Sequence, residues 1–154
     1  MDPEIPVISV VDLGIVRDVA WASGGNDAAL IVAITPTYSG CPATEVIADT
    51  IREALRGHGI ARIDLRWQLS PAWTTDWMSG AGREKLRGYG IAPPSRDERP
   101  VDVSRLLKKL EPRIACPRCG SSKVALVSQF GSTPCKALYR CQSCFEPFDY
   151  FKDH

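Results

Sequence analysis

Two pairs of cysteines in the last third of the chain have the spacing of a metal site. Cys116 and Cys119 form one Cys-x-x-Cys pair, Cys141 and Cys144 form another, and twenty-one residues separate Cys119 from Cys141. Each pair presents two thiolates from one tight turn, and four thiolates make the closed tetrahedral site that structural zinc takes. The spacing therefore predicts a zinc ribbon, in which metal binding supplies folding energy that a segment of about 40 residues lacks.

Iron is the alternative ion for these four thiolates, as in a rubredoxin-like electron carrier. The first pair, with Pro117 inside it and Gly120 after it, suits such a site. The second pair is followed by Phe145 and suits it less well. Zinc is therefore the preferred prediction, and electron transfer through iron is the alternative.

A fifth thiol, Cys135, lies between the two pairs. The preferred interpretation is a buried small residue with no ligand role, because free cysteine is often buried and behaves as a small hydrophobic residue. The alternatives are an additional metal ligand or a reactive thiol activated by the neighbouring Lys136.

The remaining cysteine, Cys41, lies in the segment Thr35–Glu45, where an apolar run ends and a helical pattern begins. A thiol at the mouth of a helix faces unpaired backbone N–H groups and the positive end of the helix dipole, and both favour the thiolate. An inert, buried thiol is an equally good interpretation, because free cysteine is among the most buried residue types. Position alone does not decide between a functional and an inert Cys41.

Carboxylates are the other candidates for chemistry in this part of the chain. Asp2 and Glu4 can ligate a metal or exchange protons, although such residues more often serve as a cap and a first-turn charge. The sequence contains no Ser-His-Asp order, phosphate loop or dinucleotide fingerprint, so an enzyme would have to work with Cys41 and carboxylates alone. The other polar candidates are expected to be turn, surface or solvated groups: Asp12, Asp18, His58 and His154.

The apolar pattern of the first part of the chain predicts a small α+β domain that presents Cys41. Strands are expected at 15–21 and 28–35, the second apolar enough to be buried on both faces. A helical period over 42–56 follows, with Thr44 or Ser39 as its cap, and alternation over 60–69 predicts another strand. The order strand, strand, helix, strand indicates one main helix packed on a mixed sheet.

The pattern of the rest of the chain predicts a connecting segment followed by the ribbon. The loop after the last of these strands carries Trp73 and Trp77, for which packing over the sheet edge is preferred to a partner-facing patch. A short helix is expected at 82–89, and residues 101–110 fit a strand or a helical turn equally. Strands at 123–129 and 136–140 are expected in the ribbon, with Tyr139 and Phe130 available for a very small core. The predicted organisation is an α+β domain at 1–92, a charged, proline-flanked linker at 93–112 and a zinc ribbon at 113–154.

Composition narrows the classes of function. The 154 residues are 44% hydrophobic and 24% charged, with a formal net charge of +1, so no bulk attraction to nucleic acid or anionic membrane is implied. The longest apolar runs are far shorter than a membrane span, and the N-terminus lacks the basic region of a signal peptide. A chain that reserves thiols for metal binding belongs in a reducing compartment, so we expect the cytoplasm.

Several of these segments resemble a known family. Asp2-Pro-Glu-Ile-Pro6, Val11-Asp-Leu-Gly-Ile-Val16 and Thr35-Pro-Thr-Tyr-Ser-Gly-Cys-Pro42 resemble the MIP18 family, the domain of unknown function 59 (DUF59) group, which is associated with iron–sulfur protein assembly. Joined to them is a more specific tail: Cys116-Pro-Arg-Cys-Gly-Ser121, Phe130-Gly-Ser-Thr133, Cys135-Lys-Ala-Leu-Tyr-Arg-Cys141 and Glu146-Pro-Phe-Asp-Tyr-Phe-Lys152. Together they resemble the PaaD family of the phenylacetyl-CoA epoxidase system, which acts in aerobic phenylacetate degradation, over essentially the whole chain.

The resemblance implies an accessory factor for a multicomponent monooxygenase, and not one of its catalytic subunits. Such a factor helps to mature the di-iron centre or the iron–sulfur cluster of the reductase. Carried onto this sequence, the family's motif cysteine is Cys41 and its acidic motif is Asp2 and Glu4, while the four paired cysteines hold zinc. Relatives usually carry a helix ahead of the acidic motif, which here follows Met1 directly, so a truncated start is expected.

One cysteine per chain cannot hold an iron–sulfur cluster, because clusters take about four thiolates. A transient iron or cluster site at Cys41 would therefore share ligands across a homodimer or with a client. The expected partners are oxygenase or reductase subunits, docked by the ribbon. A nucleic-acid-binding ribbon is the third hypothesis, which the near-neutral charge and the few cations of this segment, Lys123, Lys136 and Arg140, argue against.

Overall fold

The computed structural model of the protein describes residues 1–23, 28–38, 40–94 and 114–153. The chain divides into two compact units, residues 1–85 and residues 86–153. Within the described ranges, no helix is both long enough and apolar enough to cross a membrane.

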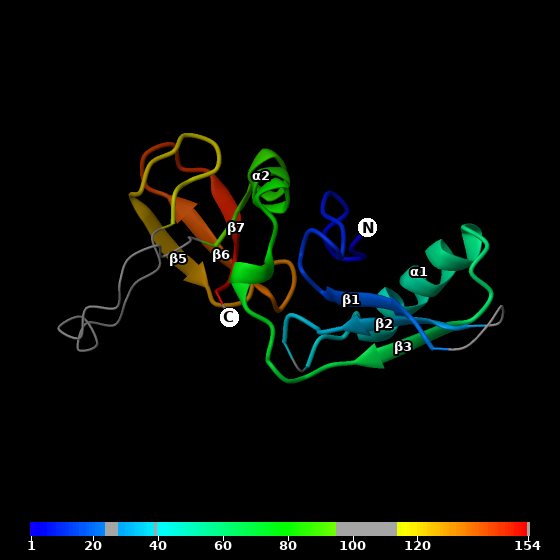
Figure 1. Ribbon diagram of the computed structural model, residues 1–154. Coiled ribbons are helices and arrows are strands. Elements are labelled where there is room, and N and C mark those ends of the chain that lie inside the picture. Colours follow the sequence, from blue (N-terminus) through cyan, green and yellow to red (C-terminus); the bar gives the residue numbers. More distant parts are fainter. Residues whose placement is uncertain (24–27, 39, 95–113, 154) are drawn as a thin grey trace. The chain divides into compact units, whose positions relative to one another are not determined.

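A three-stranded mixed sheet forms the base of the first unit (Figure 1). Its strands are β1 (Val16–Trp21), β2 (Leu30–Ile34) and β3 (Ile63–Trp67), in the order β1-β2-β3. β1 runs antiparallel to β2, and β3 runs parallel to β2. The predicted strands and the α+β class are confirmed.

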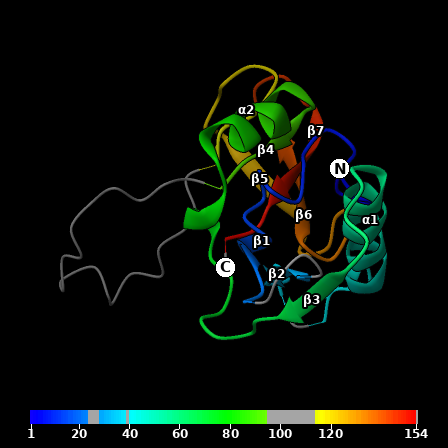
Figure 2. The same ribbon diagram turned by 45° about the vertical axis from the view of Figure 1, so that its right-hand side comes forward.

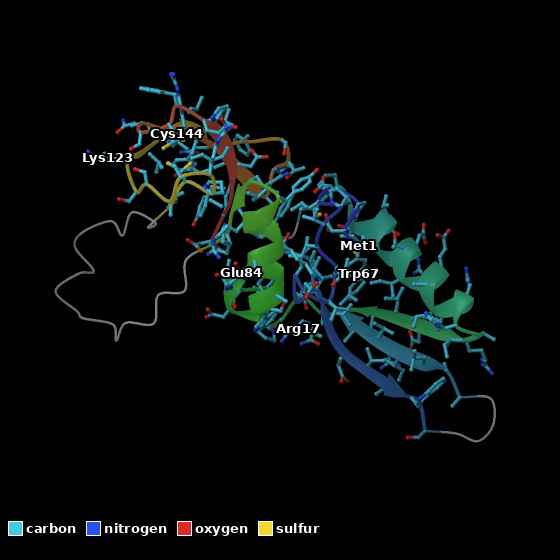
Figure 3. All side chains as sticks on the ribbon, turned by 90° about the horizontal axis from the view of Figure 1, so that it is seen from above. Met1, Arg17, Trp67, Glu84, Lys123 and Cys144 are labelled. Carbon is cyan, nitrogen blue, oxygen red and sulfur yellow. The ribbon has the colours of Figure 1, made fainter. Side chains whose placement is uncertain are left out.

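The helix α1 (Thr44–Gly57) makes the crossover that parallel strands β2 and β3 require. Figure 3 shows it lying along one side of the sheet. Its buried residues are Ile47, Ala48 and Ile51. Alternate residues of β2 are buried, while Ile31 and Ala33 between them are only partly buried. The expectation that this strand is buried on both faces was therefore wrong, because a single helix shields one face of the sheet.

Asp12 ties the turn before β1 to the segment that begins α2 (Gly80–Gly88). Its carboxylate accepts hydrogen bonds from Ser9 Oγ and Ser79 Oγ, both at 2.9 Å, and from Lys85 Nζ at 2.6 Å. Its carbonyl oxygen also accepts from the Ser79 backbone N–H at 2.8 Å. Ser79 Oγ in turn accepts from Gly82 N–H at 2.8 Å, which caps the helix. The Asp12 carboxylate thus fixes two segments that are far apart in sequence.

The two tryptophans after β3 pack within the same region. Trp73 is buried, and its indole N–H donates to the Leu13 carbonyl oxygen at 2.9 Å. The Arg17 guanidinium lies 3.4 Å from the centroid of the Trp77 ring. Gly14 has a positive φ of 73°, and a Cβ there would lie 2.5 Å from the Trp77 carbonyl oxygen, so only glycine allows this approach. The preferred packing interpretation of these tryptophans is confirmed.

The second unit is a four-stranded sheet in the order β4-β7-β6-β5 (Figure 2). Its strands are β4 (Ile91–Ala92), β5 (Val124–Ser128), β6 (Lys136–Cys141) and β7 (Pro147–Phe151). β5, β6 and β7 pair antiparallel, and β4 adds parallel to β7. The two strands expected here, β5 and β6, are confirmed, whereas β4 and β7 were not predicted.

A small core fills this sheet. It includes Cys116 and Cys141 together with five other buried residues: Ala92, Ile114, Ala137, Phe148 and Tyr150. Tyr139 packs against this core as expected, and its ring meets Tyr150 edge to face at 5.7 Å between centroids. The expectation that Phe130 joins the core was wrong, because it lies beyond the end of β5 and is 67% exposed, with Lys152 Nζ 4.5 Å from its ring centroid.

Most of the predicted linker, residues 93–112, lies outside the described residues, as does the ambiguous segment 101–110. The domain limits 1–92 and 113–154 therefore stay a prediction. The short strand β4 precedes the linker in sequence and pairs in the second sheet.

We predict that Asp12→Asn destabilises the protein at neutral pH and not in strong acid. The hydrogen bond from Lys85, helped by those from Ser79 and Ser9, lowers the pKa of Asp12 from 3.8 to about 2 despite the opposing effect of burial. A lowered pKa contributes stability above pH 3.8 that is lost as the pH falls towards 2. The difference in unfolding free energy between the wild type and Asp12→Asn, measured by urea denaturation, should be about 1 kcal/mol at pH 7 and shrink below pH 4.

Lys85→Met is the matched control for this titration. Removing the cation should give a similar loss at pH 7 and raise the pH at which the remaining Asp12 contribution disappears. A loss in Asp12→Asn that is unchanged between pH 7 and pH 3 would contradict the assignment.

Candidate functional site

The four paired cysteines converge on one point of the second unit (Figure 3, where Cys144 is labelled). Their sulfur atoms all lie within 4.8 Å of one another. The Cys116 and Cys144 sulfurs are 3.7 Å apart, and those of Cys119 and Cys141 are 3.5 Å apart. A tetrahedral ion with metal–sulfur bonds of about 2.3 Å separates its ligands by about 3.8 Å. The cluster therefore fits one four-coordinate metal ion.

The two turns that carry these thiols share one backbone feature. Gly120, directly after the first pair, has φ +73°, and Phe145, directly after the second pair, has φ +64°. This left-handed conformation suits glycine and is unusual for a bulky residue. Phe145 is 65% exposed, and the Arg140 guanidinium lies 5.5 Å from its ring centroid. The second turn thus has the same left-handed backbone conformation as the first, although Phe145 stands where the first turn has a glycine.

Hydrogen bonds within the cluster shift the pKa values of two of its thiols in opposite directions. Hydrogen bonds from the Cys144 and Ser143 N–H groups to Cys141 Sγ, at 3.5 and 3.4 Å, lower the pKa of Cys141 to about 6. At Cys119 a backbone hydrogen bond from Ser121 lowers the pKa, but the neighbouring thiols Cys144 and Cys141 outweigh it and raise the pKa to about 12. Without a metal, therefore, some of the four thiols keep their protons. A bound cation allows all four to ionise together, because its charge stabilises the thiolates.

Cys135 does not belong to this cluster. It is buried, and its sulfur lies 3.1 Å from Thr133 Oγ1. Lys136, the residue proposed to activate it, is itself buried and places Nζ 3.5 Å from Asp149 Oδ2. The position agrees with the preferred interpretation of Cys135 as a buried small residue.

Cys41 lies in the turn between β2 and α1. It is half-buried, and its backbone N–H donates to the Tyr38 carbonyl oxygen at 3.3 Å. The expectation that Thr44 caps α1 was wrong: Thr44 is the first helical residue and its hydroxyl donates back to the Cys41 carbonyl oxygen, while Ala43 occupies the cap position. Ser39, the alternative cap, lies outside the described residues.

The environment of Cys41 favours the protonated thiol. Burial is the largest cause of its raised pKa, and the negative charges of Glu4 and Asp2 raise it further. The Ala43 backbone N–H and the Thr44 hydroxyl act in the opposite direction but do not compensate. The expectation of a stabilised thiolate was therefore wrong, because two carboxylates and burial outweigh the helix terminus. The charges of Glu4 and Asp2 thus act on the Cys41 thiol from the start of the chain.

Asp2 also serves the structural role expected of a cap. It is 8% exposed, and its Oδ1 accepts hydrogen bonds from the N–H groups of Glu4 at 2.9 Å and Ile5 at 2.8 Å. Its own N–H donates to the Ile8 carbonyl oxygen at 2.8 Å. A bend and a turn follow, not a helix. These hydrogen bonds fix the turn that carries the acidic pair.

Two family models match the chain, one over each part. Residues 1–62 match a model described as an iron–sulfur cluster assembly protein. Residues 100–152 match the PaaD zinc beta ribbon domain. A crystal structure of a DUF59 domain from Bacillus anthracis is 26% identical, covers 56% of this chain and 79% of that one, and has a TM-score of 0.49.

Two curated relatives extend these matches. An Fe-S protein maturation auxiliary factor from Porphyromonas gingivalis is 38% identical over 81 residues, which cover 51% of this chain and 71% of the relative. A putative subunit of 1,2-phenylacetyl-CoA epoxidase from Escherichia coli is 51% identical over 151 residues, which cover 98% of this chain and 85% of the relative. On this near-complete match, the chain belongs to the PaaD family of phenylacetyl-CoA epoxidase components.

Proposed function

We propose that this protein is an accessory maturation factor of a phenylacetyl-CoA epoxidase system, which assists assembly of an iron–sulfur cluster or a di-iron centre. The observation that carries the proposal is that the charges of Glu4 and Asp2 act on Cys41, in a domain matched by an iron–sulfur assembly model. The names of the two curated relatives, an epoxidase subunit and a maturation factor, support it. The protein itself is not a catalytic subunit in this proposal.

Iron, free or within a cluster, is the cargo of the Cys41 site. The free thiol is protonated, and its proton must leave when sulfur bonds to iron. The charges of Glu4 and Asp2 disfavour the thiolate alone, but they attract a cation and offer hard oxygen ligands to it. One thiol with two carboxylates is an incomplete ligand set, which a client or a second copy of the chain completes. Transfer then exchanges the Cys41–iron bond for a bond to a client ligand, with no change in oxidation state.

The ribbon has a different task in this proposal. Cys116, Cys119, Cys141 and Cys144 hold zinc as a permanent structural ion, because a closed four-thiolate site leaves no open position for chemistry. Several large apolar side chains of this unit are exposed and suit docking of an oxygenase or reductase subunit: Leu126, Val127, Phe130 and Phe145. We place the protein in the cytoplasm, since a chain that keeps its thiols for metal binding belongs in a reducing compartment. We also propose that it is a homodimer.

Cys41→Ser should abolish support of epoxidase activity while leaving the fold and the zinc content unchanged. Serine keeps the size of the side chain but is a poor ligand for iron at neutral pH. The measurement is complementation of a strain that lacks the native protein, scored by epoxidase activity. Cys135→Ser is the matched control, because it removes a thiol outside both sites, and it should retain activity. Full complementation by Cys41→Ser would exclude the proposed role.

Glu4→Gln should make Cys41 more acidic. The Glu4 charge raises the pKa of Cys41, so its removal lowers that pKa and increases the thiolate fraction at pH 8. Alkylation of the Cys41 peptide, followed by mass spectrometry across pH in the metal-loaded protein, should reach its half-maximal rate at lower pH. Glu45→Gln, an exposed change in the first turn of α1, is the control and should leave the profile unmoved. An identical profile for both variants would contradict the arrangement.

The purified protein should contain one zinc per chain and be colourless. Chelation at neutral pH should unfold the second unit, because the metal supplies most of its folding energy. Elemental analysis and circular dichroism before and after chelation are the measurements. One iron per chain, with a colour that reductant bleaches reversibly, would instead establish the rubredoxin-like alternative, which the same four-thiolate geometry accommodates.

A further inference from the structure

In the described part of the chain, one edge of the ribbon sheet carries no charged side chain. β5 ends the strand order β4-β7-β6-β5, so of the described strands only β6 pairs with it (Figure 1). An edge strand presents backbone N–H and C=O groups to other chains, and proteins commonly protect such edges with charges or by making the strand short. β4 has two residues, and the edge strands of the first sheet carry charges: Arg17 and Asp18 in β1, Asp64 and Arg66 in β3. β5 has neither form of protection.

Leu126 directs its backbone hydrogen-bonding groups towards this edge. The Gln142 N–H donates to the Lys123 carbonyl oxygen at 2.8 Å, so these opposite residues form a hydrogen-bonded pair of the antiparallel ladder. Hydrogen-bonded and non-hydrogen-bonded pairs alternate along such a ladder, and the register shows no shift before Leu126. Ala125 therefore bonds to β6, whereas the N–H and C=O of Leu126 point away from it. Val127 is the extra residue of a β-bulge, so the regular part of the edge ends at Leu126.

The two faces of β5 differ in chemistry. Side chains alternate between the faces of a sheet, and directly opposite residues share a face. Lys123 and Ala125 therefore lie on one face together with Arg140, the partner of Ala125, and both cations are exposed. Leu126 and its partner Tyr139 lie on the other face, where Leu126 is 49% exposed. A strand added beyond β5 would thus meet positive charge on one face and apolar surface on the other.

The charges around this edge all have the same sign. From Ile114 to Phe145 the sequence has two lysines, two arginines and no Asp or Glu. Two of these cations pair with carboxylates outside the segment, and the other two are Lys123 and Arg140 beside β5. A zinc ion with four thiolates adds a formal charge of −2, but its ligand Cys141 lies on the opposite, apolar face. The face that carries the two cations therefore favours a negatively charged partner.

We propose that the β5 edge binds an extended segment of a partner protein in which acidic and apolar side chains alternate. The segment pairs with Leu126 through backbone hydrogen bonds, as in other cases of strand addition to a sheet edge. Its acidic side chains face Lys123 and Arg140, and its apolar side chains lie on the face of Leu126. The inference rests on the proposed function in one respect, since the segment belongs to the client that the ribbon docks.

Two other occupants fit the edge less well. The β5 strand of a second copy of this chain would bring the same cations and no carboxylate, so its charges would repel. A nucleic acid would satisfy the cations, but it offers no strand to pair with Leu126 and meets the apolar face with nothing complementary. An acidic, extended polypeptide is the partner that matches the backbone groups and both faces.

The test uses the full-length, metal-loaded protein and a short capped peptide in which Glu and Val alternate. The readouts are fluorescence anisotropy of the labelled peptide and amide hydrogen exchange of the protein. In the free protein the Leu126 N–H should exchange faster than the Ala125 N–H, and saturating peptide should protect it. Binding should be about tenfold weaker for a peptide with Lys in place of Glu, since two surface charge pairs contribute about that much. A peptide with the same Glu and Val residues in two blocks should also bind weakly.

Paired variants of the protein separate the charge from the backbone. Lys123→Glu should weaken binding of the alternating peptide by about tenfold, whereas Arg56→Glu, the same change of charge in the last turn of α1, should leave it unchanged. Leu126→Pro removes the outward N–H at a position where an edge strand tolerates proline, and it should abolish binding. Leu126→Ala keeps that N–H and should keep the preference for the acidic peptide. If Leu126→Pro does not fold, N-methylation of the Val residues in the peptide removes the matching donors and should abolish binding instead.

Several outcomes would overturn the proposal. They are a lack of saturable binding, equal affinity for the Lys or block peptide, binding without protection of the Leu126 N–H, full binding by a folded Leu126→Pro, and equal effects of Lys123→Glu and Arg56→Glu. Tighter binding of oligouridylate than of the peptide would identify nucleic acid as the occupant, and self-association that Leu126→Pro abolishes would identify a second copy. Because the readouts use synthetic peptides, failure here is distinct from failure of the Cys41 variants in complementation.

Discussion

The parallel pairing of β2 with β3 is the constraint on which the first unit depends. Two parallel strands cannot be joined by a tight turn, so α1 must cross from the end of one strand to the start of the other. That crossover leaves β2 at its carboxyl end, which is where Cys41 lies at the mouth of the helix. The segment that follows β3 returns to the same edge, where Leu69, Ala72 and Trp73 meet residues 35–38. The segment that leads to Cys41 and the segment after β3 therefore meet because of strand direction and not because of local sequence.

Electrostatics at Cys41 shows why a helix terminus alone does not define a reactive thiol. The dipole and the backbone N–H groups act in the direction expected from the sequence, but burial and the carboxylates of Glu4 and Asp2 outweigh them. A permanently ionised thiol would be open to oxidation and to adventitious metals. A protonated thiol beside two carboxylates becomes a good ligand only when a cation is present. In the proposed function this arrangement suits a site that is occupied transiently.

The sequence was informative where short-range spacing determines structure. Two Cys-x-x-Cys pairs predicted a four-thiolate cluster, and the sulfur positions agree with it. Each pair lies in a single turn whose geometry is local, whereas the pairing of β5 with β6 helps to bring the two turns together. Periodicity predicted β1, β2, α1 and β3 because it also reflects local structure. It did not predict β4, which has only two residues, or the burial of β2, which depends on what covers each face. The raised pKa of Cys41 comes from burial and from the charges of Glu4 and Asp2, which are far from it in the chain, so no local sequence pattern predicts it.

The two sulfur sites of the chain differ in the property that matters for metal handling. The ribbon cluster supplies four thiolates at tetrahedral separation, and a metal bound there has no vacant position through which a competing ligand can enter. Cys41 supplies one thiolate, so a metal bound there must be shared and remains open to exchange. The first arrangement favours retention and the second favours transfer, even for the same ion. In the proposed function the ribbon holds a permanent structural ion and Cys41 holds an ion transiently. The number of protein ligands at each site is enough to account for this difference, whatever the chemistry of zinc and iron adds.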